Sequence, residues 1–454
     1  MSDLPRRAVT RSAKLASLPL GFAGRTALGV GKRTFGRPAE AVALEIQQRT
    51  AEQLFKVLGE LKGGAMKLGQ MLSIFEAALP PEIAGPYRAT LTKLQEAAPP
   101  LPAAAVHKVL AQALGADWRE NFESFDDDPA AAASIGQVHK AVWADGRKVA
   151  VKVQYPGAGK ALISDFNQLA RMGRLFSILM PGLDVKSMLA ELKQRVAEEL
   201  DYSIEAASQT AIREAYPADD PDFYIPEVIA QAGDVLVTEW IDGTPLSKII
   251  SDGEQDERDH AALLYCRFLL SGPKRSGLLH GDPHPGNFRV MADGRLGVMD
   301  FGAVDRIPPD FLHRMGRLLR IGTMEDIDEV EDALRREEFI RDGVEIDAES
   351  LQGFLAPITE PFVTDTFNFN REWLRGMAAR VTDLRPTNVV RQLNLPPEYV
   401  IVHRVLSAGT GVLCQLECEI PARGESLRWI PGFGDDDVPE LTAAEDDTTG
   451  ELAG

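Results

Sequence analysis

The sequence predicts an α+β fold with two lobes, a smaller one rich in strands followed by a larger one that is mostly helical. Apolar residues alternate in two short stretches, 149–154 and 234–240, as expected of strands. Two further short runs flank Asp293-Gly294, a dipeptide typical of a hairpin turn. Most of the chain from 242 to about 430 is predicted to be helical instead, with breaks at Pro or Gly.

The 454 residues can bury a large core and are many for one domain. Changes in composition divide them into five segments: a basic, flexible arm (1–40), a helical extension (41–102), the smaller lobe (103–241), the larger lobe (242–432) and an acidic, disordered tail (433–454). Helical stretches are predicted in the first half at 54–79, 103–114, 159–180 and 186–215.

One segment of the larger lobe carries residues suited to phosphoryl transfer. Asp282 lies in His-Gly-Asp-Pro-His-Pro-Gly-Asn, five positions before Asn287, and Asn287 lies thirteen before Asp300 of an Asp-Phe-Gly sequence. These are the offsets of the catalytic loop and the D-F-G motif of kinases. In that chemistry one carboxylate orients the acceptor hydroxyl or water, while the Asn amide and the second carboxylate hold Mg²⁺ against the phosphates. The spacing therefore predicts a protein-kinase-like fold.

The stretch between Asn287 and Asp300 is predicted to be a β-hairpin, with strands at 288–291 and 295–299. Its strands would hold the two metal ligands at a fixed separation. The alternative is an Asp- and Asn-rich turn beside an ordinary hairpin. We favour the metal site, because three spaced ligands and a strand that ends in Asp-Phe-Gly rarely coincide.

A phosphate-binding half is predicted upstream. Val-Ala-Val-Lys ends in Lys152, the position whose lysine contacts the α- and β-phosphates in kinases. An alanine-rich loop precedes it, in which Ala131 and Ala133 replace the first two glycines of a Gly-rich phosphate loop. Alanine restricts positive φ and close approach to phosphate, so this loop should hold the triphosphate differently. An alanine run alone is more often helical, but its place before two strands favours a loop. The residues predicted to meet nucleotide are Ala131, Ala133, Ser134, Gly136, Val138, Lys152 and, at the hinge between the lobes, Glu239 and Ile241.

Charge and composition limit the partners. The formal net charge of −19 disfavours nucleic-acid binding by the chain as a whole. Residues 5–37 instead hold eight Lys and Arg and no acidic residue, so this arm either contacts an anionic membrane surface or is a flexible tail. No run of eighteen apolar residues predicts a transmembrane helix, and three Cys are too few for a disulfide framework. We expect a cytoplasmic protein, with any membrane contact peripheral and at the inner face.

Six motifs occur in a fixed order: Lys-x-Gly-Gln at 67–70, the alanine-rich loop with Gln-Val-His, Val-Ala-Val-Lys, Glu-x-Asp-Tyr-x-x-Glu-Ala at 199–206, the Asp282 loop and Asp-Phe-Gly. With these motifs the chain resembles the UbiB/AarF/ADCK family of atypical kinase-like proteins over about residues 40–320. Each motif alone is weak, whereas six in this order are highly specific.

The resemblance implies roles for individual residues. Lys152 would bind nucleotide with Glu205 as its partner, Asp282 would be the catalytic-loop Asp, and Asn287 and Asp300 would bind Mg²⁺. It also implies that the extension covers the active site, where a protein substrate would otherwise bind. The residues of that cover would be Lys67, Gln70, Glu199 and Asp201. A covered lysine does require a carboxylate, because an unpaired buried ammonium is costly.

Three functions remain open. The resemblance implies an ATP- and Mg²⁺-dependent atypical kinase or ATPase acting in isoprenoid lipid or quinone metabolism, or in lipid homeostasis. The alternatives are a nucleotide-gated protein that binds a lipid or a partner with little phosphoryl transfer, and a small-molecule kinase resembling aminoglycoside phosphotransferases. The segment after Asp-Phe-Gly lacks Ala-Pro-Glu and soon reaches Pro308-Pro309, which disfavours a peptide substrate.

Overall fold

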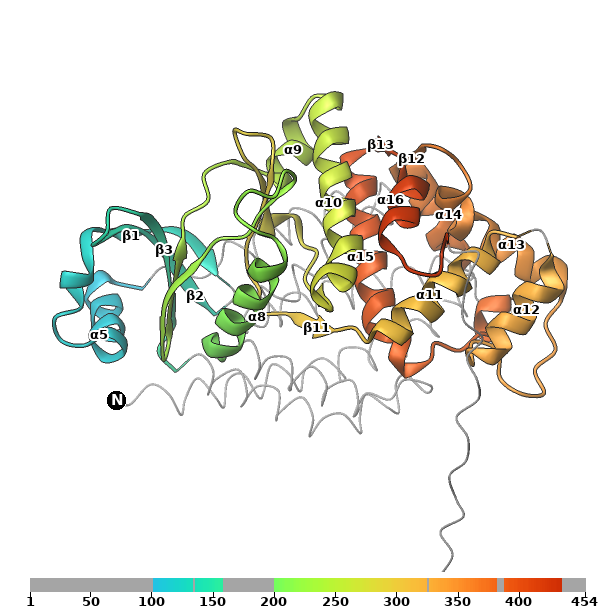
Figure 1. The fold of residues 1–454 in the computed structure, drawn as a ribbon, viewed down its shortest axis with the longest axis horizontal. Helices are drawn as coiled ribbons and strands as arrows, with labels where there is room; N and C mark the ends of the chain where they lie inside the picture. Colours follow the sequence, from blue (N-terminus) through green and yellow to red (C-terminus); the bar gives the residue numbers. More distant parts are fainter. Residues whose placement is uncertain (1–100, 134, 158–199, 325, 382–387, 435–454) are drawn as a thin grey trace, which may run out of the picture.

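The computed structural model describes residues 101–133, 135–157, 200–324, 326–381 and 388–434. They form a strand-rich lobe beside a larger helical lobe, seen at the left and right of Figure 1. This arrangement confirms the predicted α+β fold. The predicted basic arm, nearly all of the helical extension and most of the acidic tail lie outside the described residues.

The smaller lobe is built on one antiparallel sheet with the strand order β1-β2-β3-β6-β5. Its strands are β1 (Phe122–Ala133), β2 (Gly136–Trp143), β3 (Lys148–Gln154), β5 (Val228–Ala232) and β6 (Val235–Glu239). The alternation in β3 buries Val149, Val151 and Val153 and turns Lys152 to the other face. The predicted strands at 149–154 and 234–240 are therefore present, whereas the alanine run, which was predicted to be a loop, is the end of strand β1.

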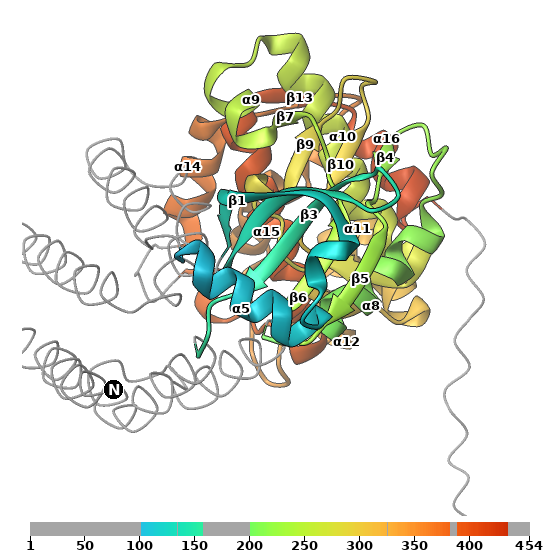
Figure 2. The same cartoon turned by 90° about the vertical axis from the view of Figure 1, so that its left-hand side faces the viewer.

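Helix α5 (Ala103–Leu114) covers one face of this sheet, as Figure 2 shows. Its buried residues Val106, Val109 and Leu110 recur at helical spacing and pack against β3 and β6. The helix follows Pro102 and stops at Gly115, whose φ of +100° is accessible mainly to glycine. A 3-10 turn, η2 (Trp118–Asn121), then leads into β1.

Helix α8 (Tyr202–Ala215) lies against the other side of the sheet and contacts β5 and β6. The sequence predicted one helix over 186–215, and this prediction was wrong at residue 201. Asp201 is extended, and its carboxylate accepts a hydrogen bond from Ser203 N. Such an N-cap is worth about 1 kcal/mol, and α8 begins after it at Tyr202, while residues 186–199 lie outside the described part of the chain.

A second sheet lies where the lobes meet, with the strand order β4-β10-β9-β7. Its strands are β4 (Phe223–Tyr224), β7 (Thr244–Pro245), β9 (Phe288–Val290) and β10 (Leu296–Val298). The predicted hairpin is β9 and β10, paired antiparallel around Gly294, which has φ +87°. β4 joins β10 in parallel, although it directly follows the segment that leaves α8.

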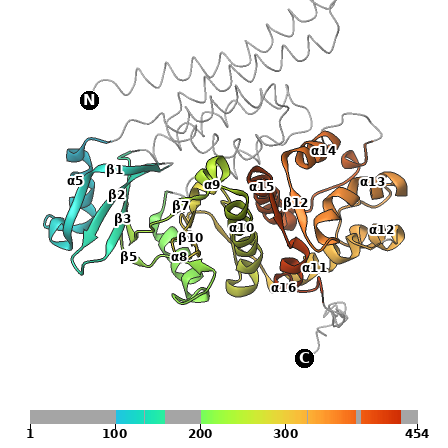
Figure 3. The same cartoon turned by 90° about the horizontal axis from the view of Figure 1, so that it is seen from above.

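The larger lobe contains, in chain order, α9 (Leu246–Asp252), α10 (Gln255–Ser276), β8 (Leu278–His280), η3 (Pro285–Asn287), β11 (Val304–Arg306), α11 (Pro309–Gly322), α12 (Ile327–Arg336), α13 (Ala348–Thr359), η4 (Glu360–Phe362), β12 (Phe367–Phe369), α14 (Arg371–Val381), η5 (Val389–Arg391), η6 (Pro397–Tyr399), α15 (Val400–Leu416), β13 (Cys418–Ile420) and α16 (Ala422–Trp429). Short antiparallel pairs join β8 to β11 and β12 to β13. Figure 3 shows α10 and α15 side by side at the centre of this lobe.

The segment Pro397–Leu416 is the one described helix that is long and apolar enough to cross a membrane, with mean hydropathy 1.2 over its best window. Of that window, 56% is buried inside the protein. Val405, Val412 and Cys414 are fully buried in the same core as α10. These contacts are those of a core helix of the larger lobe.

Candidate active site

Lys152 of β3 is held between two carboxylates that come from different parts of the chain. Its Nζ donates to Glu205 Oε1 at 2.8 Å and Oε2 at 2.9 Å, and lies 3.7 Å from Asp300 Oδ2. The Tyr202 ring lies below, with its centroid 5.2 Å from Nζ. The Glu205 side chain is only 5% exposed, whereas that of Asp300 is 36% exposed. The structure thus joins the small sheet, α8 and the Asp-Phe-Gly segment at one lysine.

Electrostatics keep this lysine charged. Burial alone would lower the pKa of Lys152, but the negative charges of Asp300 and Glu205 outweigh it and hold that pKa well above 10.5. Lys152 is therefore an ammonium group at neutral pH. A fixed cation beside an exposed carboxylate is suited to binding a phosphate chain that carries a divalent metal.

Asp300 has an uncommon backbone conformation, with φ +61°. Its Oδ1 accepts from Gly302 N at 3.2 Å, and its carbonyl accepts from His280 Nε2 at 2.8 Å. Phe301 is fully buried behind it. Non-glycine residues in this conformation occur mainly where the surrounding structure enforces them, as at functional sites.

The Asp282 loop runs from the end of β8 to the start of β9. Asn287 Nδ2 donates to Asp282 O at 3.2 Å, and Met299 N donates to Asn287 O at 2.8 Å. Tyr265 of α10 donates from its buried hydroxyl to Pro283 O at 2.6 Å. These bonds fix the loop to the hairpin and to the central helix, so Asp282 and Asn287 belong to the same rigid unit as Asp300.

Most of the predicted phosphate loop belongs to strands β1 and β2. Ala131 and Ala133 belong to β1 and lie opposite Val138 and Gly136 of β2. A Cβ at Gly136 would overlap the Val153 carbonyl oxygen, so glycine is required there by the approach of β3. Ser134 lies outside the described residues. The two alanines thus lie in the edge strand β1, which β2 separates from the strand of Lys152, while Gly136 has a packing role as well.

A buried polar chain behind this loop was missed by sequence reasoning. Leu101 N donates to Gln137 Oε1 at 2.7 Å, Gln137 Nε2 donates to His139 Nε2 at 2.8 Å, and His139 Nδ1 donates to Asp126 O at 2.8 Å. Gln137 is 1% exposed and His139 is fully buried. Gln137 and His139 are two positions apart in β2, so their side chains lie on the same face of the sheet.

At the hinge, the side chain of Glu239 is engaged within the protein. It accepts from Tyr224 Oη at 2.7 Å and from Glu227 N at 2.9 Å. Ile241 is buried against Gly297 of the hairpin. Binding of adenine by the backbone near Glu239 and Ile241 stays a prediction.

Of the predicted cover, only Asp201 lies in the described part of the chain. Its Oδ1 accepts from both Ser203 N and Ser203 Oγ, so it caps α8. Lys67, Gln70 and Glu199 lie outside that part. The pairing of Lys67 with Glu199 or Asp201 stays a prediction.

The donor set fits Mg²⁺ borne by a nucleotide. Asp300 and Asn287 offer hard oxygen ligands, and the Asp300 carboxylate is accessible. Across the described ranges, no three His, Cys, Asp or Glu side chains form a metal-binding cluster. A nucleotide-borne Mg²⁺ needs only one or two carboxylates from the protein, because phosphate oxygens and water molecules supply its other ligands.

Comparison with known proteins assigns this arrangement to a family. Residues 93–334, more than half of the chain, match the ABC1 atypical kinase-like domain. The chain is 29% identical over 445 residues to the mitochondrial atypical kinase coq-8 of Caenorhabditis elegans, covering 93% of this chain and 57% of that protein. It is 30% identical over 332 residues to mitochondrial atypical kinase COQ8 of Saccharomyces cerevisiae, covering 72% and 65%. The chain therefore spans less than two thirds of the length of both relatives.

A solved structure is similar over most of the chain. Rv3197 of Mycobacterium tuberculosis, determined in complex with erythromycin, is 44% identical with a TM-score of 0.69. The match covers 88% of this chain and all of that one. It supports the two-lobed fold described above.

Proposed function

Because the chain belongs to the UbiB family of atypical kinase-like proteins, we propose that it is a phosphotransferase or ATPase that uses ATP and Mg²⁺. The observation that carries the proposal is Lys152 held between Glu205 and Asp300, directly beside the Asp282 loop. A structural ion pair would need one carboxylate. The second carboxylate, that of Asp300, is partly exposed and would serve as a metal ligand when Mg²⁺ and phosphate bind there.

In this proposal each side chain has one task. Lys152 binds the α- and β-phosphates and is oriented by Glu205. Asn287 and Asp300 would hold Mg²⁺, which would neutralise charge on the phosphates. Asp282 orients the acceptor hydroxyl or a water molecule and accepts its proton. Ala131, Ala133, Ser134, Gly136 and Val138 would lie along the triphosphate, and the backbone near Glu239 and Ile241 would meet adenine.

The proposed acceptor is a small molecule or lipid rather than a general protein. The resemblance to this family implies work in isoprenoid lipid or quinone metabolism, so an isoprenoid lipid or a phenolic quinone precursor is the first candidate. After Asp-Phe-Gly, β11 leads within a few residues to α11 at Pro309. So short a connection leaves little platform for a peptide.

A second candidate is a nucleotide-gated binding protein with little phosphoryl transfer. The observation that favours it is the mycobacterial relative, which was determined with erythromycin bound. In this case ATP would change the affinity of the chain for a bulky apolar ligand, and the cover of Lys67, Gln70, Glu199 and Asp201 would block transfer. A small-molecule kinase resembling aminoglycoside phosphotransferases is the remaining alternative, supported by the Asp282 loop and opposed by the alanine-rich loop.

Location is also a proposal. We place the protein in the cytoplasm, with peripheral contact between residues 5–37 and the inner face of an anionic membrane. Binding to vesicles with and without anionic lipid, before and after removal of residues 5–37, tests the contact. No nucleic acid is proposed as a partner.

The deciding experiment is release of ADP by the purified full chain, with and without membrane lipids or a phenolic quinone precursor. Turnover that depends on Asp282 and is raised by an acceptor supports the transferase. Intact nucleotide binding with vanishing turnover that no lipid alters supports the gated binding protein instead.

A further inference from the structure

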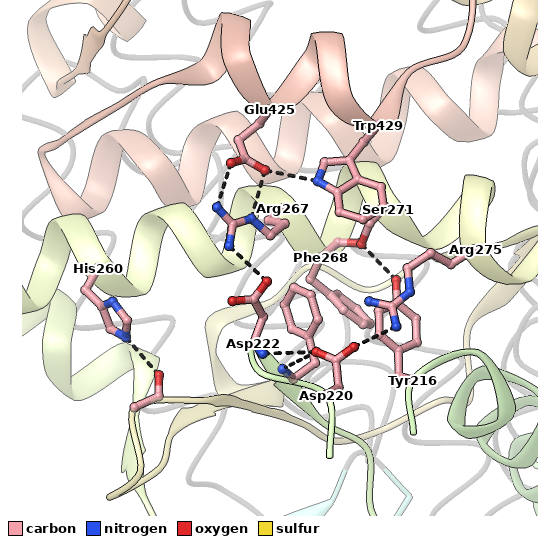
Figure 4. Close-up of polar contacts among 12 residues, drawn as sticks. Tyr216, Asp220, Asp222, His260, Arg267, Phe268, Ser271, Arg275, Glu425 and Trp429 are labelled. Atoms are coloured by element: carbon pink, nitrogen blue, oxygen red, sulfur yellow. Dashed lines mark hydrogen bonds and ion pairs between the residues drawn. The ribbon is translucent and has the colours of Figure 1, made fainter. Parts of the chain in front are cut away.

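The C-terminal end of α8 is held by a cluster of polar and aromatic residues on α10 (Figure 4). Arg275 Nη2 donates to Ala215 O at 2.7 Å and to Asp220 Oδ2 at 2.6 Å, and its Nε donates to Ala215 O at 3.1 Å. The guanidinium carbon lies 3.8 Å from the centroid of the Tyr216 ring. One side chain thus holds the last residue of the helix and the segment that follows it.

The rest of that segment is equally fixed. Tyr216 is 1% exposed, and its hydroxyl lies 2.8 Å from Ser271 Oγ of α10. Burial raises the pKa of Tyr216 to about 12, so the phenol remains neutral. Asp220 Oδ1 accepts from the backbone N–H groups of Asp222 and Phe223, at 3.0 and 2.9 Å. The chain therefore has little freedom between the end of α8 and the start of β4.

The opposite end of α8 carries Glu205, in its first turn. An α-helix of this length is a rod of about 20 Å, so the place of its last residue largely sets the place of its first turn. Gln209 and Arg213 add hydrogen bonds from α8 to the carbonyls of Pro226 and Ile225. The Lys152–Glu205 pair therefore joins a strand of the smaller lobe to a helix that is fastened to the larger one.

We propose that Arg275 is a positioning residue for the reaction: by fastening the end of α8 to α10, it keeps Glu205 in place to orient Lys152. This inference rests on the proposed function, because it assigns Arg275 to the same site. Arg275 touches neither substrate nor metal in this account and acts only through Glu205.

Arg267 is a matched control on the same helix. Its side chain is 15% exposed, against 21% for Arg275, and it is bonded to two carboxylates, whereas Arg275 is bonded to one carboxylate and one backbone carbonyl. Among the described residues its partners are Asp222, at 2.9 Å, and Glu425 of α16, at 2.7 Å. Substitution of Arg267 therefore removes a comparable ion pair without releasing the last residue of α8.

The test measures acetylation of Lys152 by acetic anhydride in the nucleotide-free full chain, quantified by mass spectrometry. Lysine reacts as the free amine, whose fraction changes about tenfold for each unit of pKa. Arg275→Lys cannot bond Ala215 and Asp220 together while stacking on Tyr216, since lysine lacks the planar fork. We expect each of the single variants Arg275→Lys and Glu205→Gln to raise the acetylation rate of Lys152 by about 3-fold to 10-fold. The control Arg267→Lys should react at the wild-type rate.

A double variant and a milder variant complete the test. Arg275→Lys with Glu205→Gln should react no faster than Glu205→Gln alone, because both act on one ion pair. Tyr216→Phe keeps the ring and loses only the bond to Ser271, so its rate should lie between wild type and Glu205→Gln. Wild-type rates for Arg275→Lys and Tyr216→Phe, or equal rises for Arg275→Lys and Arg267→Lys, would overturn the proposal.

A second measurement separates this inference from the proposed function. If wild type binds MgATP, Arg275→Lys should weaken that binding as Glu205→Gln does, and Arg267→Lys should not. Absence of MgATP binding by wild type overturns the proposed function, while the acetylation rates of Lys152 still test whether Arg275 positions Glu205. If wild type binds MgATP but Arg275→Lys leaves the reactivity of Lys152 unchanged, only the positioning role of Arg275 is overturned.

Discussion

Single residues of the site are held by groups that differ in kind. Lys152 is positioned by charge, because Glu205 and Asp300 approach its ammonium from two sides. Asp282 and Asn287 are positioned by backbone hydrogen bonds within their own loop and to the hairpin. Substitutions of Lys152, Glu205 or Asp300 should therefore act on nucleotide binding, and substitution of Asp282 should act on chemistry.

Asp282→Asn should separate chemistry from binding. The amide keeps the shape of the loop but accepts no proton, so turnover should fall by a factor on the order of 10² or more, with nucleotide affinity within severalfold. Steady-state ADP release and equilibrium MgATP binding check this on the same preparation. Turnover that survives the change would make Asp282 a structural residue.

His139 predicts a pH dependence of stability. Burial lowers the pKa of His139 below its ordinary 6.5, although the Asp126 carbonyl and the nearby Asp127 and Asp126 charges oppose the shift. As pH falls below about 6.5, the unfolded chain binds a proton before the folded one does, so the free energy of unfolding decreases. Protonated His139 would also face the Gln137 amide donor.

Thermal unfolding between pH ~7.5 and ~5.5 checks this prediction, because ordinary histidines titrate there. His139→Gln should be less stable at neutral pH and should lose less further stability on acidification than wild type does. His280 and His403, whose pKa values are also lowered by burial, leave a remaining slope. The exposed His260, bonded to Gly294 O, gives the control His260→Gln, and equal slopes for wild type and His139→Gln would contradict the account.

At the scale of elements, the alanine-rich end of β1 distinguishes this site from a Gly-rich one. Ala131 and Ala133 are paired in the ladder with β2, where they lie opposite Val138 and Gly136. Glycine at these positions would let the backbone leave the ladder, since it accepts φ values that alanine avoids. The paired alanines should hold the β- and γ-phosphates less closely than a glycine loop does.

Ala133→Gly should change the preference between ATP and ADP and release autophosphorylation. Thermal-shift titration with each nucleotide and a radiolabel assay measure the two effects. Ala132→Gly is the control, because it introduces the same residue into the same strand at a position that is not glycine in the phosphate-loop pattern. Wild-type preference and no labelling in Ala133→Gly would remove this role of the alanine loop.

Local patterns predicted the elements well, and long-range contacts poorly. The β9–β10 hairpin, α5 and the strands around Lys152 follow from periodicity and turn residues within a few positions. The ion pair of Arg275 with Asp220 joins residues 55 positions apart, and the sequence around neither residue indicates its partner. The break at Asp201 was missed because apolar spacing continued through it, although Asp is a good N-cap.

For the whole molecule, α8 and α10 connect the lobes. Helix α8 contacts both the small sheet and α10, while α10 also packs on α15, α16 and β8. Figure 1 shows this continuity from the sheet to the helical lobe. Structural changes in the small lobe on nucleotide binding should therefore also alter the contacts of α10.

The central claim is that Asp300, Asn287 and Lys152 form a Mg²⁺–nucleotide site. Thermal unfolding with saturating ATP, in Mg²⁺ and in chelator, tests it most directly for wild type, Asp300→Asn and the control Asp293→Asn at the other end of the hairpin. MgATP at 100 times its Kd should stabilise wild type and Asp293→Asn by about 2.7 kcal/mol, with most of this lost in chelator or in Asp300→Asn. Equal stabilisation of Asp300→Asn by ATP in chelator would contradict the claim.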